Sequence, residues 1–145
     1  MVRFWDSSAI VPLVLVEDSS AAAKDMLADR GGMTVWWGST IECTSAIARA
    51  EREARLDSHG TADAVAALRL LRSGWTEMDP TSKVRDMAER LIRVHPLRAA
   101  DALQLAAAII AAQDQPAALP FLTLDDRLAE AAGREGFPVI RFDRP

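Results

Sequence analysis

Short apolar runs alternate with helical patterns along the chain, and this alternation most constrains the fold. Each stretch of strand-forming residues is followed by a helical pattern, so neighbouring strands can run in the same direction. Strands that are apolar on both faces are typical of parallel sheets covered by helices on both sides. The pattern therefore predicts an α/β fold with a central parallel sheet. The expected strands are residues 2–5, 33–37, 75–78, 119–124 and 139–142.

The expected helices lie between these strands, and one region carries a stripe of large apolar residues. With 145 residues, half of them hydrophobic, the chain is long enough for one domain with a core and too short for two. Pro12 is expected to kink the first helix or to occupy its first turn. The apolar stripe is interpreted as core, with a homodimer seam or a docking surface for a partner helix as alternatives; it comprises Val65, Leu68, Leu71 and Trp75. The helical patterns cover residues 7–17, 19–30, 40–55, 62–71, 84–91, 100–112 and 126–134.

Four acidic residues lie where strands give way to helices. In parallel sheets, ligands bind beyond the carboxyl ends of the strands, at the points where helices begin. We therefore expect these four carboxylates to converge on one edge of the sheet. They are Asp6 after the first strand, Glu42 after the second, Asp125 after the fourth, and Asp101 near the start of the apolar helix at residues 100–112.

Each acid also has a purely structural interpretation. Asp6 and Asp125 fit the N-cap position, where a carboxylate accepts hydrogen bonds from the first free amides of a helix. Ser39 and Glu42 have the spacing of a capping box, and Asp101 in a first turn complements the helix dipole. If all four acids were only caps, the chain would be a non-catalytic interaction domain.

The charge balance of such an edge favours a bound cation. Four carboxylates at close range repel one another and do not all stay ionised unless a cation neutralises them. Mg²⁺ and Mn²⁺ prefer oxygen ligands. His59 and His95 are the only histidines, and they lie far apart in the sequence without a ligand-spaced partner, which argues against zinc. The sequence therefore favours Mg²⁺, with Mn²⁺ as a substitute.

Polar residues near the acids favour a phosphate ligand. Ser8 and Thr123 lie two residues from Asp6 and Asp125, where they could bond the carboxylates or a phosphate. Arg49 lies two helical turns beyond the second acid, on the same helical face. The net charge of −4 means that a polyanion needs such local arginines or bound cations. Helix-end hydroxyls and a solvated helix face are the alternatives for these residues.

The remaining conspicuous residues have structural interpretations. Trp36 and Trp37 are interpreted as core residues, with stacking on bases as the alternative. Cys43 is the only cysteine, which excludes an internal disulfide, and it is interpreted as a buried structural thiol. No apolar run approaches the roughly 20 residues that span a bilayer, and no signal pattern is seen. We therefore expect a cytoplasmic protein with no membrane partner.

The four acids lie in four longer motifs, DSSAIVPL at residues 6–13, ECTSAIAR at 42–49, AADALQLAAA at 99–108 and FLTLDDRLAEAA at 121–132. These stretches resemble the acidic motifs of PIN-domain ribonucleases, and most closely those of the VapC toxins of bacterial toxin–antitoxin pairs. The resemblance covers nearly the whole chain, with the motifs in the family's order and spacing, so residues 1–145 are expected to form one domain.

The resemblance implies a single-domain PIN-like α/β/α sandwich with a central parallel sheet. It implies a Mg²⁺- or Mn²⁺-dependent endoribonuclease that cuts RNA to leave a 5′-phosphate and a 3′-hydroxyl. It also implies a homodimer and a VapB-type antitoxin that silences the enzyme. In the doubled Asp125-Asp126, the Thr-x-Asp pattern favours Asp125 as the fourth acid. The residues that match the family's pattern are the catalytic and metal-binding acids Asp6, Glu42, Asp101 and Asp125, the flanking hydroxyls Ser8 and Thr123, and the basic Arg49.

A phosphatase or phospho-acceptor domain on a similar sheet is the other enzymatic alternative. Such proteins usually need a nucleophilic Asp early in the chain and a Lys on a later strand. The sequence DSSA lacks a second acid two residues after Asp6, and the only lysines, Lys24 and Lys83, lie in helical segments. The pattern therefore argues against this alternative, and hydrolysis of a phosphodiester by an activated water stays what the resemblance implies.

Overall fold

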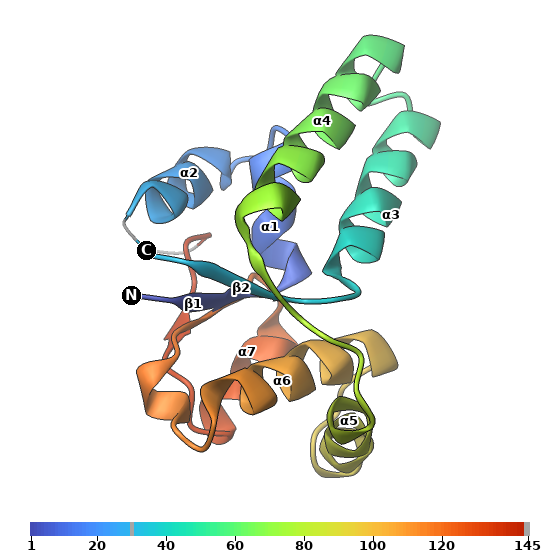
Figure 1. The fold of residues 1–145 in the computed structure, drawn as a ribbon. Helices are drawn as coiled ribbons and strands as arrows, with labels where there is room; N and C mark the ends of the chain where they lie inside the picture. The colour runs from blue at the N-terminus through green and yellow to red at the C-terminus, as the bar shows by residue number, and fades with distance from the viewer. Residues whose placement is uncertain (30, 144–145) are drawn as a thin grey trace.

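A parallel sheet in the order β3-β2-β1-β4-β5 forms the centre of the computed structural model, which describes residues 1–29 and 31–143 (Figure 1). In the register, Phe4 of β1 pairs with Thr34 on one side and with Phe121 on the other. All the neighbouring strands in these residues run parallel, as predicted. The strands are β1 (Arg3–Trp5), β2 (Met33–Trp36), β3 (Thr76–Met78), β4 (Phe121–Leu122) and β5 (Val139–Ile140).

Helices cover both faces of the sheet, which confirms the predicted α/β/α sandwich (Figure 1). The first four helices lie on one face, and the last three lie on the other. The first layer comprises α1 (Ser7–Val14), α2 (Ser20–Ala28), α3 (Ser39–Arg52) and α4 (Ser58–Gly74). The second comprises α5 (Ser82–Val94), α6 (Ala99–Ala112) and α7 (Asp126–Arg134), with a short 3₁₀ turn (Pro116–Ala118) before β4.

The order of the strands reverses at the centre of the sheet. The chain runs outward from β1 through β2 to β3, crosses to the opposite face, and returns to the other side of β1 as β4 and then β5. A reversal of this kind leaves a crevice beyond the carboxyl ends of the two strands that flank it, and ligands bind there in open α/β sheets. In this chain those strands are β1 and β4, which are followed by two of the predicted site acids.

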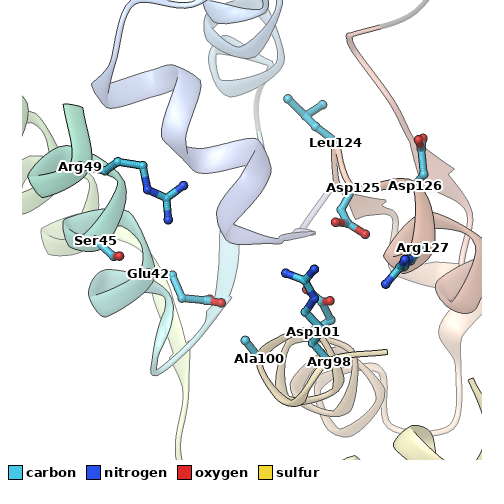
Figure 2. A pocket seen from close by; sticks show the side chains of 10 residues that line it. All are labelled: Glu42, Ser45, Arg49, Arg98, Ala100, Asp101, Leu124, Asp125, Asp126 and Arg127. Atoms are coloured by element: carbon cyan, nitrogen blue, oxygen red, sulfur yellow. The ribbon is translucent and has the colours of Figure 1, made fainter. Parts of the chain in front are cut away.

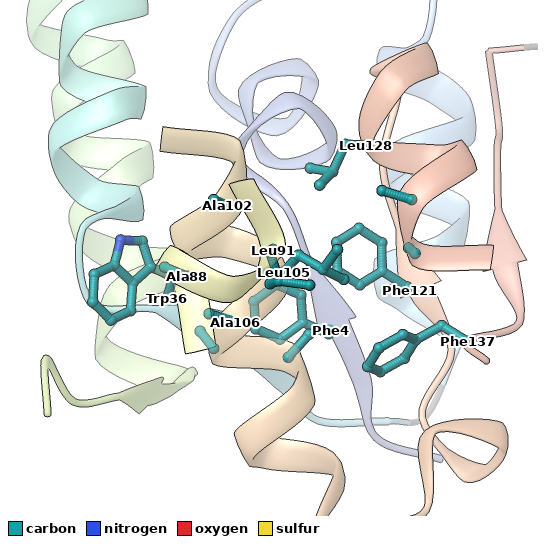
Figure 3. Close-up of a cluster of buried hydrophobic side chains, with 14 of the residues drawn as sticks. Phe4, Trp36, Ala88, Leu91, Ala102, Leu105, Ala106, Phe121, Leu128 and Phe137 are labelled. Carbon is teal, nitrogen blue, oxygen red and sulfur yellow. The ribbon is translucent and has the colours of Figure 1, made fainter. Parts of the chain in front are cut away.

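Two apolar clusters hold the helical layers on the sheet. On the side of α5, α6 and α7, the rings of Phe4 and Phe121 stack with centroids 5.2 Å apart, and Phe137 packs against them (Figure 3). On the other side, Leu68 is buried, and Val65, Leu71 and Trp75 are partly buried against the same cluster. The interpretation of this stripe as core is therefore confirmed.

Several helix ends differ from the predicted ones for local reasons. The first helix stops at Val14 because Leu15 adopts an extended conformation, and it keeps Pro12 in its interior. The fourth begins earlier than expected, because the Asp57 carboxylate accepts a hydrogen bond from the Gly60 amide at 2.7 Å. The second ends at Ala28, and the predicted end at Arg30 lies outside the described residues.

The tryptophan and cysteine predictions have mixed outcomes. Trp36 is buried as predicted, but Trp37 is 47% exposed because it follows the end of β2 and packs edge-on against Trp36. Cys43 is fully buried, and that burial raises the pKa of its thiol to about 12, so it is an unreactive structural residue. Among the described residues, none of the helices combines the length and apolar character needed to cross a bilayer.

Candidate active site

The structure brings the four predicted acids to one edge of the sheet. Asp6 is the N-cap of α1, Asp125 is the N-cap of α7, and Glu42 and Asp101 lie in the first turns of α3 and α6. The last three line an open cavity of about 710 Å³, shown in Figure 2. Asp6 is not part of the cavity lining and is only 3% exposed. The cavity is lined by Glu42, Ser45, Arg49, Arg98, Ala100, Asp101, Leu124, Asp125, Asp126 and Arg127.

A network of hydroxyl groups fixes the buried carboxylate of Asp6. The hydroxyls of Ser8 and Thr123 both donate to Oδ2 of Asp6, the second at 2.9 Å. The two hydroxyl oxygens lie 3.2 Å apart, and each accepts a backbone amide, from Leu124 at 2.8 Å and from Asp125 at 3.1 Å. The predicted hydroxyl pair therefore joins the end of β1 to the segment that follows β4.

Burial and mutual repulsion make these carboxylates hard to ionise. Burial raises the pKa of Asp6 to about 6, although the two hydroxyl donors oppose the shift, and nearby Asp101 adds to it. Burial also raises the pKa of Glu42, with contributions from the charges of Asp6 and Asp101. The pKa of Asp101 is raised by burial and by Asp125. The negative charges of the four acids therefore repel one another, and a cation between them would relieve this repulsion.

The carboxylate of Glu42 is held at the cavity by a contact that the sequence did not suggest. Its carboxylate accepts a hydrogen bond from Nε2 of Gln104 on α6, and the same nitrogen donates to Oγ of Ser39 at 3.0 Å. The predicted capping box is wrong. Ser39 is the first helical residue, Gly38 is the N-cap, and no side chain caps this end.

Basic side chains surround the acids at the rim of the cavity. Arg49 lies on the same face of α3 as Glu42, as predicted, and Arg98 and Arg127 approach from the starts of α6 and α7 (Figure 2). The charges of Arg98 and Arg127 oppose the rise in the Asp101 pKa. Sequence reasoning missed these two arginines, although each lies within three residues of a predicted acid.

Arg141 separates the roles of the two adjacent aspartates after β4. Its guanidinium donates to Oδ1 of Asp126 at 2.9 Å and to the carbonyl oxygen of Leu124 at 3.0 Å. Figure 2 shows the Asp126 carboxylate turned away from Asp101 and that of Asp125 turned towards it. Asp125, and not Asp126, is thus the one of the two that faces Asp101.

The ligand atoms that the four acids offer are of the kind that a hard divalent cation binds. Every acid at the edge offers carboxylate oxygen, which Mg²⁺ and Mn²⁺ prefer. Among the described residues, no three His, Cys, Asp or Glu side chains form a group that could hold one ion as they stand. Mg²⁺ usually binds one or two carboxylates and keeps several waters, so a full cage of protein ligands is not required. Both histidines make other contacts, His95 with Glu135 at 2.8 Å and His59 with Asp63 at 3.5 Å.

Comparisons with solved structures show the same fold over the whole chain. VapBC2 from Rickettsia felis, bound to a DNA fragment from its promoter, has a TM-score of 0.66 at 13% identity, covering 97% of this chain and 98% of that one. FitAcB from Neisseria gonorrhoeae has a TM-score of 0.63 at 15% identity, with 100% of both chains covered. VapBC-5 from Mycobacterium tuberculosis, a member of the VapBC family of toxin–antitoxin systems, has a TM-score of 0.53 at 21% identity, covering 97% and 96%.

A family comparison agrees with the fold and the motifs. No curated protein matches the chain. The family model of the PIN domain matches residues 3–134, a span that includes Asp6, Glu42, Asp101 and Asp125. The chain belongs to the PIN domain family.

Proposed function

We propose that the chain is a Mg²⁺- or Mn²⁺-dependent endoribonuclease, the toxin of a toxin–antitoxin pair. The observation that carries the proposal is the convergence of four carboxylates at the reversal point of the sheet, where burial and neighbouring charge raise the pKa values of Asp6, Glu42 and Asp101. Acids arranged in this way are costly to ionise unless a cation is bound. The arginine rim above them suits a phosphodiester backbone.

Each site residue has a distinct role in the proposed reaction. Asp6, Asp101 and Asp125 would hold the cation, and Glu42 would either join them or orient the attacking water and accept its proton. When bound, the cation would lower the pKa of a coordinated water and offset charge that develops on the phosphate. Ser8 and Thr123 keep Oδ2 of Asp6 in place through their hydroxyl hydrogen bonds. No side chain acts as a nucleophile, and the products are a 5′-phosphate and a 3′-hydroxyl.

Arg49→Ala should weaken RNA binding more than it slows the chemical step. The side chain lies at the rim, beyond Glu42, where it can reach a backbone phosphate. We expect KM for RNA to rise several-fold with kcat nearly unchanged. The slope of log affinity against log salt should become shallower by about 0.7, the value for one lost phosphate contact on a single strand. Cleavage rates and fluorescence anisotropy across a salt series measure both, and an unchanged salt slope would place Arg49 outside the RNA path.

Asp125→Asn and Asp126→Asn should separate the two adjacent acids. The first removes a charge that faces Asp101, so we expect RNA cleavage to fall at least about tenfold. The second removes a charge that is already paired with Arg141, so activity should stay within about twofold of wild type. Cleavage of one RNA substrate by both variants at saturating Mn²⁺ measures this. The reverse order of activities would exchange the two assignments.

The partners of the chain form the second part of the proposal. Structural neighbours whose names identify them as VapBC systems or a toxin–antitoxin complex support a VapB-type antitoxin. The homodimer is proposed on the resemblance of the sequence motifs alone. Inducible expression of wild type beside Asp6→Asn, with the ends of cellular RNA mapped, tests toxicity, catalysis and substrate together. New RNA ends and growth arrest in the wild type alone are the expected result.

A further inference from the structure

Gln104 is a buried polar residue in the middle of the apolar helix α6. Its side chain is fully buried, and it bridges α6 to the start of α3. Its amide nitrogen makes two hydrogen bonds there, to the carboxylate of Glu42 and to Oγ of Ser39 at 3.0 Å. The two helices that carry Glu42 and Asp101 are thus joined by one side chain beneath the cavity.

The amide of Gln104 is oriented so that its nitrogen donates to Glu42, and this orientation leaves its own oxygen without a hydrogen bond. Oε1 of Gln104 is buried and has no hydrogen-bond partner among the described residues. Turning the amide around would place that oxygen against the Glu42 carboxylate, where two acceptors repel each other. A buried polar atom without a partner destabilises a fold, so an apolar side chain of similar size would pack here at lower cost. The arrangement is explained by what the amide does to Glu42.

We propose that Gln104 is a positioning residue, which fixes the Glu42 carboxylate at the edge of the cavity while Ser39 fixes the amide. The proposal rests on the proposed nuclease function. The side chain of Glu42 is partly exposed and has three rotatable bonds. Ser7 also hydrogen-bonds its carboxylate but contributes less than Gln104, so without the Gln104 contact Glu42 would leave the productive position for part of the time. Gln104 does not itself line the cavity, and it acts only through Glu42.

Gln104→Met tests this role, because it keeps the size of the side chain and removes both the donor and the unpaired oxygen. We expect kcat for Mn²⁺-dependent RNA cleavage to fall about 10- to 100-fold, the range typical of groups that orient metal-site residues. KM for RNA and the melting temperature should stay near the wild-type values. Gln115→Met, the same change at an exposed position outside the cavity, is the matched control.

A comparison in the Glu42→Ala background separates positioning from packing. If Gln104 acts only through Glu42, Gln104→Met should cause no further loss of activity once Glu42 is absent. Gln104→Asn, which keeps the amide but is one methylene shorter, should lose activity as Gln104→Met does, and it serves as the second variant if the first fails to fold. Equal losses in both backgrounds, or full activity of Gln104→Met, would overturn the proposal.

An NMR measurement keeps the proposal independent of the nuclease assay. In the wild type, the Gln104 side-chain amide protons should exchange slowly with solvent, and Glu42→Ala should shift one of them strongly while an exposed Gln115 amide stays unchanged. A wild-type protein that cuts no RNA with Mn²⁺ would refute the proposed function, and the NMR result would still decide whether Gln104 holds Glu42. Fast exchange or no shift would refute the positioning role.

Discussion

Asp6→Asn is expected to reduce Mn²⁺-dependent RNA cleavage by at least about 1,000-fold while the protein stays folded. Asp6 is the most deeply buried of the four acids, and it is the one at which the hydroxyls of Ser8 and Thr123 converge. Asparagine keeps the shape and one acceptor oxygen but removes the charge that attracts a cation. Cleavage of a labelled RNA with and without Mn²⁺ measures the effect. Asp86→Asn, at an exposed position on α5 outside the cavity, is the control.

The same substitution should stabilise the metal-free protein at neutral pH. The pKa of Asp6 is raised from 3.8 to about 6 in the folded state, chiefly by burial, so the folded state binds more protons than the unfolded state between these values. The free energy of unfolding therefore falls as pH rises from about 4 to 6, by about 3 kcal/mol in total for this group. Asparagine does not titrate, so the free energy of unfolding of Asp6→Asn should not show this fall between pH 4 and 6.

Melting temperatures of both proteins between pH 4 and 8, in EDTA, measure this difference. We expect the curves to diverge as pH rises, with Asp6→Asn melting at the higher temperature at pH 7. Parallel curves would mean that ionisation of Asp6 does not destabilise the folded state. Full nuclease activity of Asp6→Asn, or activity undiminished by EDTA, would refute the proposed function.

Mn²⁺ should raise the melting temperature of the wild type by about 5 to 10 °C, and Asp101→Asn should remove most of that shift. A ligand that binds only the folded state at 100 times its Kd stabilises it by about 2.7 kcal/mol, and each kcal/mol is worth about 2–4 °C in a domain of this size. Asp101 is chosen because its charge interacts with those of both Asp6 and Asp125. Differential scanning fluorimetry with a Mn²⁺ series measures the shift.

The Mn²⁺ effect should also depend on pH. Cations compete with protons for carboxylates whose pKa values are raised, so the shift should be larger at pH 8 than at pH 5.5. Asp86→Asn should respond to Mn²⁺ as the wild type does. A melting temperature that Mn²⁺ does not move would favour the alternative in which the four acids are only helix caps.

Much of the site was predictable because its acids lie where strands end and helices begin, and such boundaries are visible in the sequence. Asp6 and Asp125 are N-caps, as their sequence context indicates, and the carboxylates also face one another because the strands before them are parallel. Their structural and functional interpretations therefore do not compete. The pairing of Ser8 with Thr123 follows from the same rule, since β1 and β4 are neighbours.

The missed features depend on tertiary contacts that spacing does not reveal. Gln104 contacts Glu42 across 62 positions of sequence, and its only local signal is that it interrupts an apolar stretch of α6. The capping box failed because Ser39 lies inside the helix and faces Gln104 rather than its own backbone. Trp37 was misplaced because β2 ends one residue before it, and strand ends depend on the partner strand.

The central place of β1 in the sheet also bears on when activity can arise during synthesis. Asp6 is made early, but the hydroxyl of Thr123 that holds it belongs to a segment 117 positions later. At elongation rates of up to about 20 residues per second, several seconds separate the two on the ribosome. During that interval the nascent chain lacks β4 and the fourth acid. The carboxylate cluster is therefore completed only when synthesis is nearly finished, which would delay the proposed activity until then.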